Sequence, residues 1–502
     1  MGRDRAVCSC AVTLSMNFLL RECHLYQGPF ASQFRAPPRG IILIFHGEKH
    51  KIDLCGNYLL RTFGLPISIL AVLAVTVACL VPNTFGQDAV QPVATNFPSP
   101  ENQPSAEPSP AFQASQTAAG SPIVDINGQA VAETPRRFHF AFQLTVRGVY
   151  DDNINLTQSN KQGDFYTSIE PVISFGLGGT GGDQTDFLSF VYAPNGYIFA
   201  DNSNADALQH VIHVAAQRQF AKLTLGVNED IQILNSTNLT SLSDTTGRQA
   251  NVDVGQRTKE NIFTTNANLS YDLSSKTFLS AGGNYQVYDY PSLISSETVS
   301  GSLSINYNYG AKVIVGIGGT GGYDTAEGLA SDQYFEQGNL QLSYRASGKI
   351  NFSGSVGIEV RQFANNARDD YISPVFNLNG TYQPFDGTFI SLTGSRTTQN
   401  SGIVNGADFA STKIDVGIRQ RFLQRVSLGV NGGYENDNYF SVANNVDVTR
   451  DDDYYYIQSS IDVNVTRYWT VGAYYLHRED ASSLDAFGFS DNQFGARTTL
   501  TF

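Results

Sequence analysis

Apolar and polar side chains alternate along most of the chain between residues 138 and 502. The alternation is clearest in segments 138–147, 299–309 and 350–361, where Phe, Tyr, Leu, Ile or Val returns at nearly every second position. The positions between them hold mainly Ser, Asn, Thr, Gln or a charged residue. One apolar face with a period of two residues is the mark of a half-buried β-strand. The pattern therefore predicts an all-β body made of many short strands.

Eighteen segments qualify as strands, and a count of sixteen stays open as an alternative. An even number is what a closed barrel with both termini at one end requires. The candidates begin near residues 138, 165, 186, 208, 219, 260, 275, 297, 311, 334, 348, 370, 386, 408, 424, 454, 466 and 491. Three of these strands contain a proline, which removes a ladder hydrogen bond, so we expect β-bulges at Pro171, Pro194 and Pro374.

Tight and long connections alternate between these candidates. Ser274–Ser275 and Thr466–Arg467 are tight, whereas 233–259 and 437–453 are long. Bacterial barrels have short periplasmic turns and longer extracellular loops. The alternation predicts that residue 138 and Phe502 both face the periplasm, and it makes 233–259 the candidate for a loop that plugs the lumen.

The composition favours a membrane barrel over a soluble sandwich. Only 16% of the residues are charged and 12% are aromatic, and many of the aromatic residues fall near strand ends. A soluble sheet would carry more Lys and Glu on its outward face, whereas aromatic girdles and an apolar outer band are typical of barrels in lipid. The predicted fold is a transmembrane up-and-down antiparallel β-barrel over residues 138–502.

The N-terminal part has a different character. Residues 67–81 form a short apolar run, followed by small residues up to a plausible cleavage before Gln87, so we interpret 1–87 as leader and signal peptide. A signal anchor, a lipoprotein site at Cys79 and a misassigned start remain alternatives. All five cysteines precede residue 80, which suits an oxidising compartment for the rest. The Pro-, Ala-, Gln- and Ser-rich segment 88–137 is expected to be a disordered periplasmic arm.

The first strand and its continuation carry a family resemblance. Residues 149–154 read Val-Tyr-Asp-Asp-Asn-Ile, and the chain continues through 168–175 to a strand start at 185–188. These residues resemble a β-barrel porin family of Gram-negative outer membranes, some of whose members are encoded with exopolysaccharide biosynthesis proteins. The resemblance, taken over roughly residues 138–502, implies an outer-membrane location and passage of polysaccharide or other solutes. It also implies polysaccharide export proteins as partners, and it supplies no catalytic residues.

No motif for chemistry accompanies the strand pattern. Four histidines follow residue 87, without a nucleophile motif, and His210 and His213 lie on opposite faces of a strand. The chain is therefore expected to be no enzyme and to need no metal or cofactor. Its net charge of −14 excludes nucleic acid as a natural partner. Membrane lipid and lipopolysaccharide are the expected surroundings.

Strand parity selects the residues that would line the lumen. The candidates are Arg147, Glu359, Arg361, Lys413, Asp415, Arg419, Arg421 and Arg497. Lys413, Asp415, Arg419 and Arg421 share one face of one strand, a mostly basic row that would attract anionic solutes unless neighbouring strands neutralise it. At the C-terminus, Phe494, Leu500 and Phe502 resemble the signal read by the outer-membrane assembly machinery. Two functions stay open, a porin-like passive channel and a structural or adhesive barrel with a plugged lumen.

Overall fold

The structure is a computed structural model that describes residues 138–178, 186–235, 250–329, 332–347, 349–364, 368–443 and 446–502. All of these residues belong to one of the two units into which the chain divides, Pro66–Phe502. The predicted leader, the predicted arm and residues 236–249 of the proposed plug lie outside the described part of the chain. Among the described residues, no helix is long and apolar enough to cross a membrane.

The described residues form eighteen strands and one short 3-10 turn, η2 (Ser203–Ala205). The strands are β1 (Phe138–Asp151), β2 (Asp164–Gly178), β3 (Phe187–Phe199), β4 (Ala207–Gln219), β5 (Leu223–Leu234), β6 (Glu260–Asp272), β7 (Thr277–Asp289), β8 (Ser296–Gly310), β9 (Val313–Ala326), β10 (Gln333–Ser347), β11 (Ile350–Phe363), β12 (Tyr371–Tyr382), β13 (Thr388–Asn400), β14 (Ala407–Phe422), β15 (Val426–Ser441), β16 (Asp451–Asn464), β17 (Trp469–Ser482) and β18 (Phe489–Thr501). Every predicted strand start lies within four residues of an observed one.

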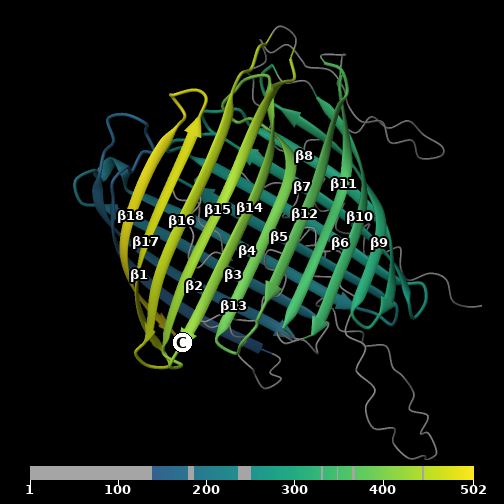
Figure 1. Ribbon diagram of the computed structural model, residues 1–502, viewed down its shortest axis with the longest axis horizontal. Helices are drawn as coiled ribbons and strands as arrows, with labels where there is room; N and C mark the ends of the chain where they lie inside the picture. The colour runs from purple at the N-terminus through teal and green to yellow at the C-terminus, as the bar shows by residue number, and fades with distance from the viewer. Residues whose placement is uncertain are drawn as a thin grey trace, which may run out of the picture. The chain divides into compact units, whose positions relative to one another are not determined.

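The strands form one closed antiparallel sheet (Figure 1). Each strand pairs with the next along the chain, and β1 pairs with β18 from Gln143↔Thr501 to Asp151↔Gln493. This last ladder closes the barrel, because it satisfies the two edges that an open sheet would leave unpaired. The predicted up-and-down barrel of eighteen strands is confirmed, and the count of sixteen is wrong.

The two ends of the barrel differ in their connections. At one end, which we call the turn end, strands are joined by tight turns such as 220–222 and 311–312. The other, the loop end, has longer connections such as 152–163 and 235–259. Phe138 and the C-terminus both lie at the turn end (Figure 1).

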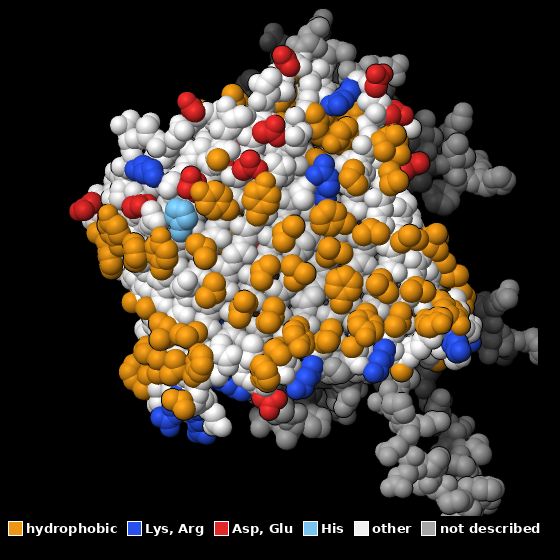
Figure 2. Space-filling model, viewed as in Figure 1, with side chains coloured by type: hydrophobic (Ala, Val, Ile, Leu, Met, Phe, Trp, Pro, Cys, Tyr) orange, Lys and Arg blue, Asp and Glu red, His pale blue; other side chains and the backbone are white. Residues whose placement is uncertain are grey.

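The outward face of the wall is a band of exposed apolar side chains. Ile305, Ile317, Leu340 and Val356 stand opposite one another across four consecutive strands, β8 to β11. All four are more than two-fifths exposed. Apolar side chains cover the middle of the surface between the two ends (Figure 2). Such a surface is stable only against lipid, and the alternate residues carry their polar groups to the interior.

The expectation of bulges at the three strand prolines is wrong. Pro171 and Pro194 lie in a gap of the β2–β3 ladder, which stops at Ile169↔Gly196 and resumes at Ile173↔Tyr192 in the same register. A missing N–H therefore interrupts the pairing without adding a residue. The two register shifts among the described ladders occur in β8, between Asn308 and Gly310, and in β10, between Arg345 and Ser347.

Pro374 lies in a larger interruption, between β12 and β13. These strands pair only from Phe376↔Arg396 to Tyr382↔Ile390. Nearer the loop end, residues 371–375 keep only β11 as a partner and residues 397–400 keep only β14. Proline is tolerated at such an edge because its lost N–H has no ladder to join.

Past this interruption, the loop-side ends of β13 and β14 lie inside the wall. Asp408 and Ala410 share the face of β14 that is exposed further down at Ile414, yet both are almost completely buried. Ala410 packs in a cluster with Phe363 of β11 and Phe440 of β15, and the side chain of Gln333 in β10 donates to Asn400 of β13 (3.4 Å). The overlap narrows the barrel at the loop end.

The assigned faces can be tested with one pair of arginine substitutions. Ile358 is outward and 60% exposed, so Ile358→Arg should destabilise the assembled barrel by roughly 2–4 kcal/mol. Ser355, in the same strand, faces the interior, so Ser355→Arg should lower the stability of the assembled barrel only slightly. Gly357 is unsuitable as the inward control because a Cβ there would meet Asn339 Oδ1 at 2.1 Å. Urea unfolding in liposomes measures the difference, and equal stability of the two variants would contradict the register.

Candidate functional site

The largest described cavity lies inside the barrel and measures about 590 Å³. Its walls come from the strands between β3 and β13. The lining is mostly amide, hydroxyl and glycine, with Arg345 and Arg396 as its charged side chains. The amide side chains are Gln217, Asn228, Asn266, Asn268, Asn284, Gln286, Gln337, Asn339, Gln341 and Asn377. An interior of this kind offers both hydrogen-bond donors and acceptors to an uncharged polar solute.

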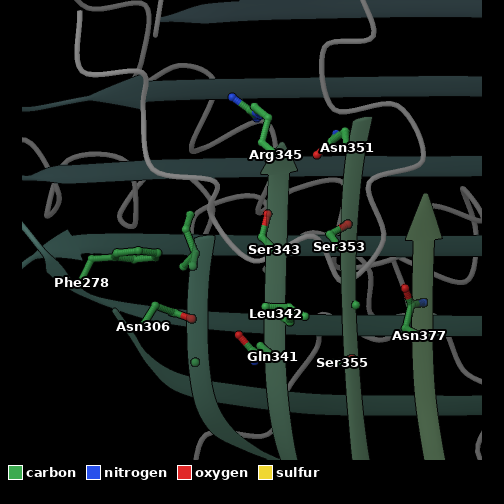
Figure 3. A pocket seen from close by; sticks show the side chains of 13 residues that line it. Phe278, Asn306, Gln341, Leu342, Ser343, Arg345, Asn351, Ser353, Ser355 and Asn377 are labelled. Atoms are coloured by element: carbon green, nitrogen blue, oxygen red, sulfur yellow. The ribbon is translucent and has the colours of Figure 1, made fainter. Parts of the chain in front are cut away.

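A smaller cavity of about 80 Å³ continues this lining toward the turn end (Figure 3). Gln341, Ser343 and Arg345 project from successive inward positions of β10. Asn351, Ser353 and Ser355 do the same on the neighbouring β11. The two strands thus present two parallel rows of polar groups.

Most of the lumen candidates selected by parity are held in ion pairs. Arg147 contacts Glu170 (2.9 Å), Arg361 contacts Glu359 (3.0 Å), and Arg497 contacts Asp462 (2.6 Å). Arg361 also binds Asp324 and lies 4.0 Å from Asp408. Glu359 and Arg361 are only 2% exposed, so they belong to a packed network rather than to an open surface.

In the row of residues on β14, Lys413, which is the member nearest the loop end, is neutralised by an ion pair. Lys413 Nζ lies 2.6 Å from Glu435 Oε1 on β15. Asp415 accepts a hydrogen bond from the hydroxyl of Tyr456 (2.7 Å). Arg419 and Arg421 follow on the same face toward the turn end, where both are half-buried. Lys413 is therefore a paired charge, and the row is not a uniform basic strip.

Carboxyl groups outnumber basic groups in the interior of the loop end. The described arginines buried there are Arg361, Arg450 and Arg478. The buried carboxyl groups around them are Asp151, Asp164, Asp253, Glu260, Asp324, Glu359, Asp408, Glu435, Asp437, Asp452, Asp480 and Asp491. Burial favours the neutral form of a carboxyl group, so the number of these groups in the mouth of the barrel does not by itself set the charge there.

Residues 250–255, which follow the undescribed part of the 235–259 connection, are folded against the inside of the loop end. Asp253 is their main anchor. It accepts hydrogen bonds from Ser401 Oγ (2.7 Å), the backbone N–H of Gly402 (2.7 Å) and the hydroxyl of Tyr439 (3.0 Å). Burial raises the pKa of Asp253, against the lowering effect of Arg450 and these hydrogen bonds. We call residues 250–255 the inturned segment.

Arg450 clamps the inturned segment from the other side. Its Nη2 donates to the carbonyl of Val252 (3.0 Å) and its Nη1 lies 3.8 Å from Asp253. The guanidinium also pairs with Asp452 (2.6 Å) and lies 3.9 Å from the ring centroid of Phe487. Val252 belongs to a buried cluster that includes Leu156 and Phe489, so the segment contacts several parts of the mouth.

Sequence reasoning singled out the 233–259 connection but not the residues that hold it. Two glycines permit the close packing. Gly255 has φ +62°, and a Cβ on Gly402 would meet Tyr290 at 3.0 Å and Asp253 at 3.4 Å. Asp253 and Ser401 are 148 residues apart, so no local pattern links them. For the cavity, by contrast, the Asn and Gln at inward parity were a usable signal.

Two residues of the predicted assembly signal, Phe494 and Leu500, share the outward face of β18, and Phe502 follows directly after the strand. Phe494 is 57% exposed and packs against Tyr475, and Phe502 is 67% exposed and stacks on Phe142. Leu500, on the same face, is half-buried. Phe502 also exchanges backbone hydrogen bonds with Phe142, which ties the chain end to β1.

Comparison with protein families finds a match over residues 323–502 to the family described as "Putative beta-barrel porin 2". The match runs from the end of β9 through β18. It confirms the resemblance to β-barrel porins inferred from the sequence. The residues that suggested it, 149–154, 168–175 and 185–188, lie outside the matched range, and the association with exopolysaccharide stays a prediction. No curated protein matches the chain.

Solved structures of outer-membrane proteins are also similar to this chain. OpdK of Pseudomonas aeruginosa with vanillate is 11% identical with a TM-score of 0.38, and the match covers 72% of this chain and 99% of OpdK. OccK2 (OpdF) of the same organism, in complex with glucuronate, is 11% identical with a TM-score of 0.39, covering 72% and 98%. OccAB4 of Acinetobacter baumannii is 11% identical with a TM-score of 0.37, covering 72% and 98%.

Removing the carboxylate of Asp253 should release the inturned segment. Asp253→Ala leaves Ser401, Gly402, Tyr439 and Arg450 without their common acceptor, which costs on the order of 1–3 kcal/mol of local stability. We expect the single-channel conductance of Asp253→Ala in a planar bilayer to be higher, or to fluctuate more, than that of the parent protein. Asp485→Ala, in an exposed loop, is the matched control and should behave as the parent protein. Unchanged conductance in Asp253→Ala would mean that the segment does not limit the path.

The ion pair on β14 and β15 gives a prediction for selectivity. Glu435→Gln removes the partner of Lys413, so the local potential becomes more positive and the reversal potential in a salt gradient should shift toward anions. Glu479→Gln makes the same chemical change beside His477, on the outward face of β17, and should leave the reversal potential unchanged. Equal shifts in both variants would show that Lys413 does not face the conducting path.

Proposed function

We propose that this protein, a porin-like β-barrel of the Gram-negative outer membrane and not an enzyme, is a passive channel for uncharged polar solutes of the sugar type. The observation that carries the proposal is the lining of the 590 Å³ cavity. Amide and hydroxyl groups replace the hydrogen bonds that a polyhydroxylated solute loses when it leaves water, without the desolvation cost of a charge. A polysaccharide chain presents the same chemistry, which keeps passage of exopolysaccharide within the proposal.

The charge distribution argues against the expectation that the solutes are anions. Lys413 is paired with Glu435, and carboxyl groups surround the buried arginines of the mouth. An anion entering from the loop end would meet exposed acidic residues of the loops, such as Asp201, Asp369 and Asp370, before it reached Arg345 or Arg396 in the cavity. Neutral solutes avoid this barrier because their transfer depends on hydrogen bonding and size.

A structural or adhesive barrel is the second candidate, and one observation favours it. The inturned segment and the overlapping ends of β13 and β14 both occupy the loop end, so the path is narrow there. Eighteen strands nevertheless leave an interior wide enough for an aqueous channel. Occlusion would therefore have to come from the mouth.

The surroundings complete the proposal. We infer that the turn end faces the periplasm and the loop end faces the cell exterior, as short turns and long loops do in bacterial barrels. The exposed Phe494 and Phe502, together with Leu500, would then be available to the assembly machinery during insertion. Lipopolysaccharide around the outer half and polysaccharide export proteins at the periplasmic end remain predicted partners.

Liposome swelling tests the channel directly. Proteoliposomes should swell in isotonic solutions of neutral sugars, faster for monosaccharides than for trisaccharides, and the protein should give discrete steps in a planar bilayer. Ser355→Arg adds bulk inside the cavity, so it should slow disaccharide entry severalfold. The reason is that the rate of permeation of a large solute falls steeply as the pore becomes narrower. Ser292→Arg, in an exposed part of the 290–295 loop, is the control and should not slow it. A folded protein that neither swells liposomes nor conducts would support the structural barrel.

A further inference from the structure

Exposed basic side chains occur at nearly every described turn of the turn end. Six connections each carry one, and all six side chains are exposed. They are Lys222, Lys276, Lys312, Lys349, Arg425 and Arg467. The described acidic residues of the turns are Asp186 and Asp386. We call the six residues the basic rim.

The loop end has the opposite charge. Acidic residues of its described connections include Asp152, Asp201, Asp206, Glu327, Asp332, Asp369, Asp370, Asp447 and Asp485, against Lys161, Arg257, Lys259, Arg368 and Arg450. In the face shown in Figure 2, acidic side chains gather over the loop end and basic ones along the turn end, with the apolar band between them. The barrel is therefore electrically polarised along its axis.

Apolar and aromatic side chains beside the basic rim fix its depth in a membrane. Tyr309 is 77% exposed, Phe385 71% and Leu423 90%, and each lies at a turn of the same end. The guanidinium of Arg467 lies 4.4 Å from the ring centroid of Tyr468. Exposed tyrosine and tryptophan residues sit at the level of lipid headgroups, so the cations next to them lie at the depth of the phosphates.

We propose that the basic rim binds the phosphate groups of anionic phospholipids in the leaflet at the turn end. Lys and Arg donate charge-assisted hydrogen bonds to phosphate, and basic residues near a membrane surface attract anionic lipids. Around the turn end, successive basic turns would gather such lipids into an annulus. Around the loop end, acidic residues outnumber basic ones in the described connections, so the phospholipid binding is expected at the turn end. This inference rests on the barrel spanning a membrane, and it holds whether or not the lumen conducts.

Lipid association measured without transport tests the proposal. The purified protein is reconstituted in phosphatidylcholine vesicles that contain spin-labelled phosphatidylglycerol or spin-labelled phosphatidylcholine, and the immobilised fraction of each label is compared. We expect a preference for phosphatidylglycerol of about twofold or more at low salt, which falls as salt screens the charges. No preference at low salt would overturn the proposal.

Matched double substitutions locate the binding. Lys276→Gln with Lys312→Gln should reduce the preference, and replacing all six residues of the basic rim with Gln should abolish it. Lys161→Gln with Lys259→Gln removes the same charge from exposed positions at the loop end and should leave the preference intact. Equal losses from both pairs would mean that net charge, and not the rim, attracts the lipid. A heat-dependent gel shift checks that each variant is folded.

Discussion

The ladder between β1 and β18 is the constraint on which the rest of the structure depends. In lipid, an unpaired backbone N–H or C=O has no water to replace its partner, so a sheet is stable there only when it closes on itself. Gln143↔Thr501 through Asp151↔Gln493 make that closure, and Phe502 extends it through its exchange with Phe142. Once the sheet is closed, strand parity assigns every side chain to lipid or to the interior.

The interruption between β12 and β13 shows how this rule is relaxed at the loop end. Residues 371–375 and 397–400 lose each other as partners, and the ends of β13 and β14 turn inward. Buried polar contacts replace the missing ladder on the inside, where Arg361 is bound by Asp324 and Glu359 and lies near Asp408. The same inward displacement brings Ser401 and Gly402 within reach of Asp253. One break in the wall therefore helps to position the narrow part of the path.

The closed barrel also determines where charged side chains lie. Inside, neighbouring strands place Lys413 against Glu435 and Arg497 against Asp462, so the proposed path is selected by amide and hydroxyl groups rather than by free charges. Outside, the ends of the strands carry the remaining charges, basic at the tight turns and acidic at the loops. The interior would act on solutes and the two rims on the surrounding lipids, because the apolar band separates them.

The sequence by itself determined where the strands lie and which faces they present, because a period of two residues is a local property that each segment carries independently. Ile358 and Ser355 could be assigned to opposite faces in this way, and the tight turns gave the order of the strands. Their number was predicted as eighteen with sixteen left open, and the closed sheet decided it. The lengths of the ladders could not be predicted from the sequence. Pro171 lies in a gap of the β2–β3 ladder, which resumes in the same register, and Pro374 lies where β12 and β13 separate. Whether Lys413 is free depended on a side chain of the adjacent strand. The anchoring of Asp253 by Ser401, Tyr439 and Arg450 was decided only by the tertiary structure, because closure of the barrel brings together residues that no sequence period relates.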